Sequence, residues 1–171
     1  VALRCIPIVI GELSVVRHYA ERLALGRRLR VVDRPADANS ETTDLQILDL
    51  KNIDFSKVRL GEVDVACGRA ALDYIRAGVN LSLNSELDAL VTGPIHKEAA
   101  QLAGINAPGH TEYLAALCGV PEVRMLLVVD HLRAMHISTH LSLRQALDYV
   151  TKERILETIH YGVGALKQLH I

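Results

Sequence analysis

The feature that most constrains this fold is the alternation of short apolar runs with longer segments of helical periodicity. We predict strands over residues 4–10, 29–33, 45–50, 87–92, 124–129 and 132–139. We predict helices over residues 15–25, with Ser14 as the N-cap, and over 63–83, 96–103, 111–118, 143–150 and 151–169. Strands that alternate with helices indicate a largely parallel sheet covered by helices.

The last two predicted strands are separated only by Asp130 and His131, which predicts a β-hairpin. A hairpin adds an antiparallel component to the sheet. The predicted fold class is therefore α/β, with a mixed, mostly parallel sheet flanked by helices. Ligands of such sheets collect at the carboxyl ends of the strands, which is where Thr92-Gly93-Pro94 and Thr139-His140 follow their strands.

Length and charge narrow the class of protein. A chain of 171 residues suits one compact domain. A net charge of -1 without a basic stripe argues against a nucleic-acid partner. Three distant cysteines without CxxC spacing indicate reduced thiols and a cytoplasmic location, and the apolar run at the start is too short to cross a membrane. The chain starts inside a predicted strand without Met, so we expect an internal piece of a longer protein.

The segment 91–112 contains two turns that suit a small-molecule site. The first is Thr92-Gly93-Pro94-Ile95-His96-Lys97, in which glycine permits close backbone approach and the following helix presents unpaired N–H groups to an anion. Lys97 could add a point charge for a phosphate. The alternative is an ordinary strand-to-helix turn with a solvated lysine.

The second turn, Pro108-Gly109-His110-Thr111-Glu112, places an imidazole, a hydroxyl and a carboxylate at the start of a helix. Thr111 and Glu112 have an alternative role as helix caps, since acidic residues favour helix N-termini. Capping does not explain His110. An imidazole there can hydrogen-bond a substrate oxygen or carry a proton near neutral pH.

A third candidate is His140, at the end of an apolar strand and just before a helix. Neutral imidazole is a common metal ligand, but a metal normally needs three or four ligands, and no HxH or HExxH spacing surrounds His140. A structural role is the alternative. We assign surface or packing roles to His18, His131, His136, His160 and His170.

These three elements, in this order, resemble the 4-hydroxythreonine-4-phosphate dehydrogenase family of pyridoxine biosynthesis and its relatives acting on four-carbon sugar-acid phosphates. The resemblance rests on DALVTGPIHKEAAQLAGINAPGHTEYLA at 88–115 and MLLVVDHLRAMHISTHLSLRQAL at 125–147, and more loosely on GRAALDYI at 68–75. It covers nearly the whole chain and is weakest before residue 60.

The resemblance implies a fold like that of isocitrate and isopropylmalate dehydrogenases. It implies an NAD- or NADP-dependent oxidation of a phosphorylated hydroxy acid, followed by decarboxylation. It also implies a divalent metal (zinc, magnesium, manganese or cobalt) that acts as a Lewis acid. The family is homodimeric, with active sites shared across the interface.

Transferred residue by residue, the resemblance implies that His110 and Thr111 bind substrate, that Lys97 contacts substrate or its phosphate, and that His140 is one of three metal-binding histidines. The catalytic and cofactor-binding residues are left unassigned. The family's glycine-rich GDPAGIGPE-like start and its Asn-Pro-His-Ala-Gly and Tyr-His-Asp-Gln-Gly motifs do not occur here. We therefore expect residues 1–171 to be a single α/β region within a roughly twice-longer, two-domain enzyme.

Two other classes stay open. A fragment that keeps the fold without the missing motifs would act as a catalytically incomplete binding or dimerisation module. Another α/β phosphate-binding enzyme, such as an acyl-phosphate transferase, is a third hypothesis, against which the His-Thr-Glu element argues. The length of the reading frame around the chain distinguishes the first two classes.

Overall fold

The computed structural model describes residues 5–105, 109–139 and 141–170. The chain divides into two compact units, Val1–Gly119 and Val120–Ile171. These are called the first and the second unit below.

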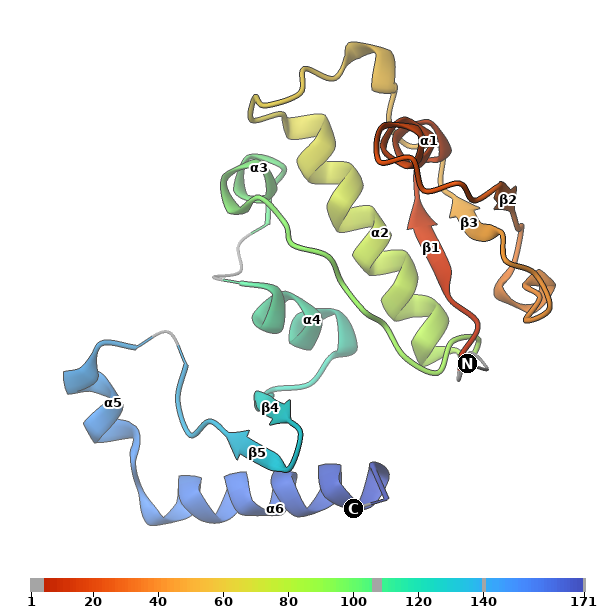
Figure 1. Cartoon of the computed structure of the whole chain (residues 1–171). Helices are drawn as coiled ribbons and strands as arrows, with labels where there is room; N and C mark the ends of the chain where they lie inside the picture. The colour runs from red at the N-terminus through yellow and green to blue at the C-terminus, as the bar shows by residue number, and fades with distance from the viewer. Residues whose placement is uncertain (1–4, 106–108, 140, 171) are drawn as a thin grey trace. The chain divides into compact units, whose positions relative to one another are not determined.

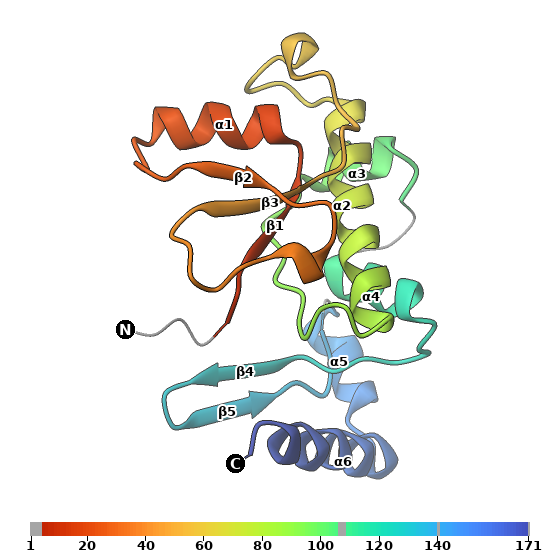
Figure 2. The same ribbon diagram turned by 90° about the vertical axis from the view of Figure 1, so that its right-hand side faces the viewer.

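The first unit is built on a three-stranded parallel sheet. Its strands are β1 (Ile8–Gly11), β2 (Leu29–Val31) and β3 (Leu45–Asp49), in the spatial order β1-β3-β2, as Figure 2 shows. The central strand β3 carries Ile47, whose side chain is fully buried. A central parallel strand is covered on both faces, which explains why the adjacent residues Gln46 and Ile47, whose side chains point to opposite faces, are both buried.

Four α-helices belong to the first unit: α1 (Leu13–Arg22), α2 (Val65–Leu83), α3 (Lys97–Leu102) and α4 (His110–Cys118). Two short 3-10 turns, η1 (Pro35–Asp37) and η2 (Phe55–Lys57), lie in the connections. The long helix α2 lies beside β1 (Figure 1). It begins after Asp64, whose carboxylate accepts a hydrogen bond from the backbone N–H of Cys67 at 2.7 Å and so caps the helix.

The apolar core of the first unit lies where α2 meets α3 and α4. Its buried side chains come from all three helices: Leu72, Ile75 and Val79 from α2, Ala100 from α3 and Tyr113 from α4. The apolar residues of α2 recur at helical spacing, which gives this helix a face for both partners. Helices α3 and α4 therefore both pack against α2.

Glycine allows α2 and α3 to approach each other closely. A Cβ on Gly68 would overlap the carbonyl oxygen of Ala99 and lie 2.5 Å from its carbonyl carbon. Both groups are backbone atoms that a rotamer change cannot move. Gly68 is therefore required by the packing of α2 against α3.

The prediction that Ser14 caps the first helix is wrong. The N-cap is Glu12, and α1 begins at Leu13. One oxygen of Glu12 accepts a hydrogen bond from the Ser14 hydroxyl at 3.1 Å, and the Leu13 N–H donates to Asp49 at 3.0 Å. Glu12 thus caps the helix in place of Ser14, and Asp49 at the end of β3 adds a long-range contact that the local sequence does not reveal.

The strand predicted over residues 87–92 does not form: this segment has no strand partner among the described residues. Leu90 instead packs against α2 at Gly78, and Val91 is 93% exposed. A strand needs a hydrogen-bonded neighbour, and an apolar run by itself does not supply one. Thr92-Gly93-Pro94 therefore follows an extended segment and not a strand end.

The second unit combines a hairpin with two helices. Strands β4 (Leu126–Val129) and β5 (Leu132–Met135) pair antiparallel, which confirms the predicted hairpin. They form a two-stranded sheet of their own within the described residues, and β5 ends before Thr139. The helices α5 (Leu143–Tyr149) and α6 (Lys152–Gln168) follow.

A buried arginine ties the start of the second unit to α6. The side chain of Arg124 is 4% exposed and forms ion pairs with Glu122 at 2.7 Å and Glu157 at 3.4 Å. It also donates a hydrogen bond to the hydroxyl of Thr158 at 3.3 Å, and its guanidinium lies 5.2 Å from the ring centroid of Tyr161. The segment before β4 is thereby fixed to α6.

The predicted fold class is confirmed: the first unit has a parallel sheet flanked by helices. Of the helices in the described ranges, none has the length and apolar character needed to cross a bilayer.

Candidate functional site

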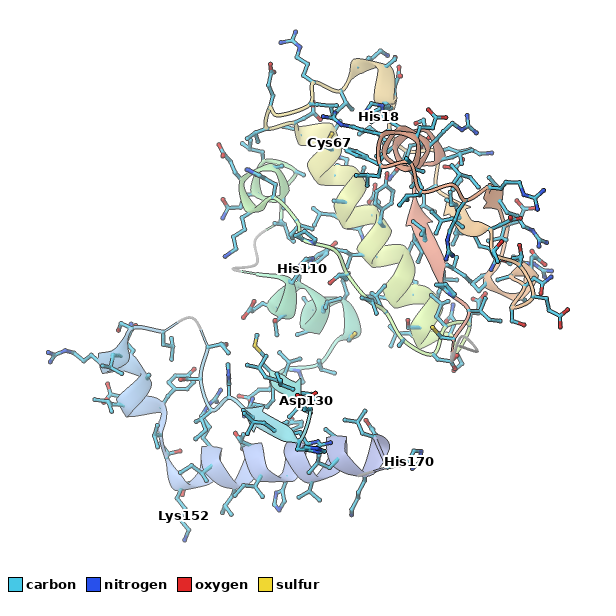
Figure 3. All side chains as sticks on the ribbon, in the orientation of Figure 1. His18, Cys67, His110, Asp130, Lys152 and His170 are labelled. Atoms are coloured by element: carbon cyan, nitrogen blue, oxygen red, sulfur yellow. The ribbon has the colours of Figure 1, made fainter. Side chains whose placement is uncertain are left out.

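The predicted substrate-contacting residues His110 and Thr111 occupy the first turn of α4, after Gly109 as the N-cap. Figure 3 labels His110 at this end of the helix. Tyr113 lies one turn further along and is buried in the core with residues of α2. Residues three and four positions apart share a face of a helix, so the core contact of Tyr113 fixes the face on which His110 lies.

Buried polar atoms distinguish this turn. The Nε2 atom of His110 and the Oε2 atom of Glu112 are both inaccessible to solvent and have no hydrogen-bond partner among the described residues. Thr111, between them, is partly buried. The sequence left Glu112 open between a role in the site and helix capping, because the burial of its carboxylate depends on how α4 packs.

Lys97 is the first residue of α3 and is exposed. Its neighbour His96 caps the helix: its Nδ1 accepts a hydrogen bond from the backbone N–H of Ala99 at 3.4 Å. A cation in the first turn opposes the helix dipole, so this lysine does not stabilise α3. Among the described residues, no ion pair or hydrogen bond joins Lys97 to His110 or Thr111.

A second group of polar side chains lies at the carboxyl edge of the parallel sheet, where ligands of such sheets usually bind. Glu12 directly follows β1, and Asp49 is the last residue of β3. Tyr74 of α2 lies near both carboxylates. Burial, with the negative charges of Glu12 and Asp49 as smaller causes, raises the pKa of Tyr74 to about 12. Tyr74 is therefore a neutral hydroxyl at physiological pH.

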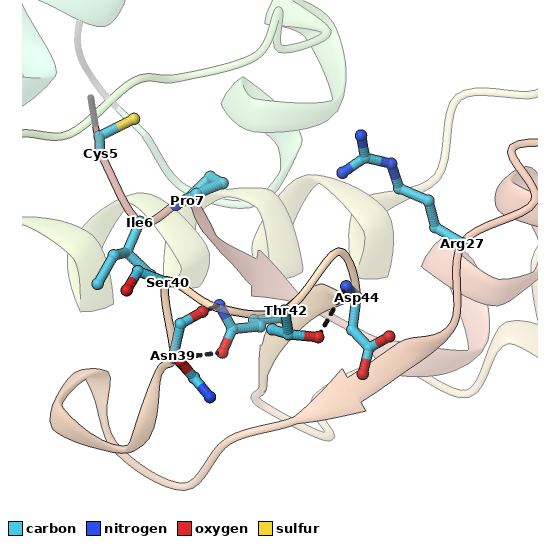
Figure 4. Close-up of a pocket in the computed structure, with 9 residues that line it drawn as sticks. Cys5, Ile6, Pro7, Arg27, Asn39, Ser40, Thr42 and Asp44 are labelled. Carbon is cyan, nitrogen blue, oxygen red and sulfur yellow. Dashed lines mark hydrogen bonds between the residues drawn. The ribbon is translucent and has the colours of Figure 1, made fainter. Parts of the chain in front are cut away.

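A small, shallow hollow that is partly open to solvent lies at the opposite edge of the sheet (Figure 4). Its lining includes Pro7 before β1, Arg27 before β2 and Asp44 before β3. These residues lie at the amino ends of the strands, whereas ligands of parallel sheets bind at the carboxyl ends. The hollow is therefore not a candidate ligand site. The side chain of Gln46 closes the adjoining loop by accepting a hydrogen bond from Asn39 N–H at 2.7 Å and donating to its carbonyl at 3.0 Å.

The predicted metal ligand His140 lies outside the described residues. Within the ranges that the structure describes, no three or more histidine, cysteine, aspartate or glutamate side chains are grouped so that they could hold a metal ion. The described part of this chain therefore does not form a metal centre by itself. All three cysteines are free thiols, as the sequence predicts.

Comparison with known proteins identifies the relatives of this chain. Residues 3–171 match the family model described as "Pyridoxal phosphate biosynthetic protein PdxA". A D-threonate 4-phosphate dehydrogenase from Cupriavidus necator is 33% identical over 168 residues, which is 98% of this chain and 50% of that protein.

Solved structures give the same result. A 4-hydroxythreonine-4-phosphate dehydrogenase from Burkholderia phymatum has a TM-score of 0.89 at 32% identity, covering 98% of this chain and 51% of its own. The corresponding enzyme from Klebsiella pneumoniae has a TM-score of 0.84 at 35% identity, covering 94% of this chain and 49% of its own. The chain thus spans about half the length of the relatives it matches. Because the match extends over nearly every residue, this chain belongs to the PdxA family of pyridoxal phosphate biosynthetic proteins.

Proposed function

We propose that the protein is an NAD- or NADP-dependent dehydrogenase that oxidises and decarboxylates a phosphorylated hydroxy acid with the help of a divalent metal. The substrate would be 4-hydroxythreonine 4-phosphate or a related acid such as D-threonate 4-phosphate, and the pathway pyridoxal phosphate biosynthesis. The observation that carries the proposal is the family match over residues 3–171. The relatives that match are named as dehydrogenases of these two phosphorylated acids.

The proposed roles follow from the chemistry of each side chain. His110, with a buried Nε2 that has no partner among the described residues, hydrogen-bonds a substrate oxygen. The hydroxyl of Thr111 donates or accepts a second hydrogen bond. Lys97, an exposed ammonium at the start of α3, attracts the substrate phosphate as a point charge.

The cofactor and the metal extend this proposal beyond the described residues. The nicotinamide would accept the hydride that leaves the substrate carbon. His140 is proposed as one of several metal ligands, since the described part of the chain gathers no complete ligand set. Zinc, magnesium, manganese and cobalt are the candidate ions.

A cytoplasmic homodimer, and a two-domain enzyme about twice as long as this chain, stay predictions. The relatives support the greater length, since the chain spans half of theirs. A catalytically incomplete module that only binds or dimerises is the competing function. The reading frame around the chain, and the assay described next, distinguish the two.

We expect His110→Ala in the full-length protein to lower kcat/KM for the phosphorylated acid about 10- to 100-fold, as the loss of a hydrogen bond to a charged ligand predicts. Steady-state rates of nicotinamide reduction measure this. The matched control is His160→Ala, which removes an exposed histidine of α6. Equal kinetics for His110→Ala and the control would remove His110 from the site, and a wild-type protein with no activity would favour the binding module.

We expect Lys97→Met to raise KM by about tenfold with little change in kcat, because a charge that holds the phosphate in both ground and transition state contributes uniform binding. The same residue type at the same helix position gives the control. Lys152 is the first residue of α6, as Lys97 is of α3, and is also exposed. If Lys152→Met raises KM as much as Lys97→Met, the effect is one of general charge and Lys97 has no specific role.

A further inference from the structure

The first turn of α4 holds two buried polar atoms that lack hydrogen-bond partners among the described residues, Nε2 of His110 and Oε2 of Glu112. Buried polar atoms in folded proteins are nearly always paired, and an unpaired one lowers stability. His110 already has a proposed partner in the substrate. Glu112 has none, and its carboxylate needs a donor.

Single atoms elsewhere are also buried without a partner among the described residues: Oε2 of Glu12, Nε2 of His18 and Nε of Arg133. Glu12 uses its second oxygen to cap α1 and to accept from Ser14, and Arg133 donates through Nη1 to the carbonyl of His131 at 3.0 Å. The ring of His18 packs against Phe55, with 5.0 Å between centroids. The first turn of α4 differs because it places two such atoms two residues apart.

Gly109 makes room for the carboxylate of Glu112. A Cβ at position 109 would lie 3.0 Å from Glu112 Oε2, closer than such contacts normally are. The backbone of Gly109 is extended, with φ -168° and ψ -177°, so its conformation does not require glycine. The feature that glycine supplies here is space over its Cα, into which the Glu112 side chain folds back.

We propose that Glu112 is a further substrate-contacting residue beside His110, and that its carboxylate accepts a hydrogen bond from a hydroxyl or ammonium group of the phosphorylated hydroxy acid. This inference rests on the function proposed above. An ionised carboxylate only accepts hydrogen bonds, and it repels the phosphate and carboxylate of such a substrate, so its contact is with a donor group.

The competing role for Glu112 is helix capping. A glutamate at the third position of a helix can accept a hydrogen bond from the N-cap backbone, and a glutamine can do the same. Glu112 Oε2 makes no such bond. Capping and substrate contact therefore predict different behaviour for the isosteric variant Glu112→Gln, which keeps the size and the capping ability of the side chain and loses its charge.

The experiment measures kcat/KM and Tm of the full-length enzyme and of Glu112→Gln, with D-threonate 4-phosphate and 4-hydroxythreonine 4-phosphate as probes and NAD or NADP as oxidant. We expect Tm to stay near the wild-type value and kcat/KM to fall about tenfold or more for the acid that the wild type turns over, the factor for a lost charge-assisted hydrogen bond. A kcat/KM within about twofold of wild type would overturn the proposal.

Gly109 provides a second, independent arm. Gly109→Ala should lower kcat/KM because its new Cβ displaces the carboxylate, and the double variant Gly109→Ala/Glu112→Ala should be no worse than Glu112→Ala. The contrary result is that Gly109→Ala lowers kcat/KM by the same factor in the wild-type enzyme and in the Glu112→Ala variant. The contact between Gly109 and Glu112 would then not be the cause, and the proposal would fail.

His110→Ala separates this inference from the function on which it rests. If His110→Ala leaves kcat/KM unchanged, the proposed substrate site itself is wrong. If His110→Ala lowers kcat/KM and Glu112→Gln does not, the site stands and only the role of Glu112 is refuted.

Discussion

Replacing Gly68 with alanine is expected to lower the free energy of unfolding by about 3 kcal/mol or more, the upper part of the range for overpacked interiors. The added Cβ would overlap the Ala99 carbonyl of α3. Because its neighbours are backbone atoms, the two helices must move apart. That movement also shifts Ala100, which belongs to the core shared with α4. Urea denaturation followed by circular dichroism measures the loss.

The control for this substitution is Gly164→Ala. Gly164 lies inside α6, and a Cβ there would meet no atom within 4 Å. Alanine has the higher helix propensity, so this variant is expected to gain about 0.5–1 kcal/mol. If Gly68→Ala and Gly164→Ala had similar free energies of unfolding, the close approach of α2 and α3 would not require glycine at position 68.

Removal of the Arg124 side chain is the second large effect. We expect Arg124→Ala to lower the free energy of unfolding by about 2 kcal/mol, because the buried guanidinium loses its charge-assisted hydrogen bonds and packing, while the remaining carboxylates of Glu122 and Glu157 are 41% and 57% exposed and can be solvated. The guanidinium holds Glu122 and Glu157 and donates to Thr158, and lysine cannot reproduce this set of donors. Arg124→Lys should therefore recover only part of the loss. Urea denaturation at neutral pH measures both variants.

Arg28→Ala is the matched control, since Arg28 forms one ion pair with Asp44 at 3.3 Å and its side chain is 88% exposed. Exposed pairs contribute about 0–1 kcal/mol, so little change is expected. An Arg124→Ala variant as stable as this control would contradict the prediction.

The same ion pair should respond to pH. The hydrogen bond from Arg124 lowers the pKa of Glu122. A lowered pKa in the folded state contributes stability above the ordinary pKa of a glutamate, and that contribution is lost as pH falls through the lowered value. The difference in stability between wild type and Arg124→Ala should therefore decrease in acid.

Most helices and strands could be predicted from the sequence because periodicity and capping are local. The helix predicted over 63–83 is observed as Val65–Leu83, and the strand over 45–50 as Leu45–Asp49. The run at 87–92 shows the limit of this reasoning. Its apolar residues suit a strand and a packed coil equally well, and the contact of Leu90 with α2 decides between them.

The candidate site divides in the same way. His110, Thr111 and Lys97 were predicted as candidates from residue types next to turns, and the structure places them in the first turns of α4 and α3. Their roles stay predictions. The position of the Glu112 side chain over Gly109 could not be predicted, because a carboxylate at this position is equally compatible with a helix cap.

By itself the sequence determined the alternation of elements, the hairpin and the family, since each depends on residue type and spacing along the chain. Only the tertiary structure decided which strand pairs with which, why Gly68 must lack a side chain, and which polar atoms of Glu112 and Arg124 are buried. Burial and close approach are created by segments far apart in sequence. Their consequences for stability and binding therefore appear only when those segments are packed together.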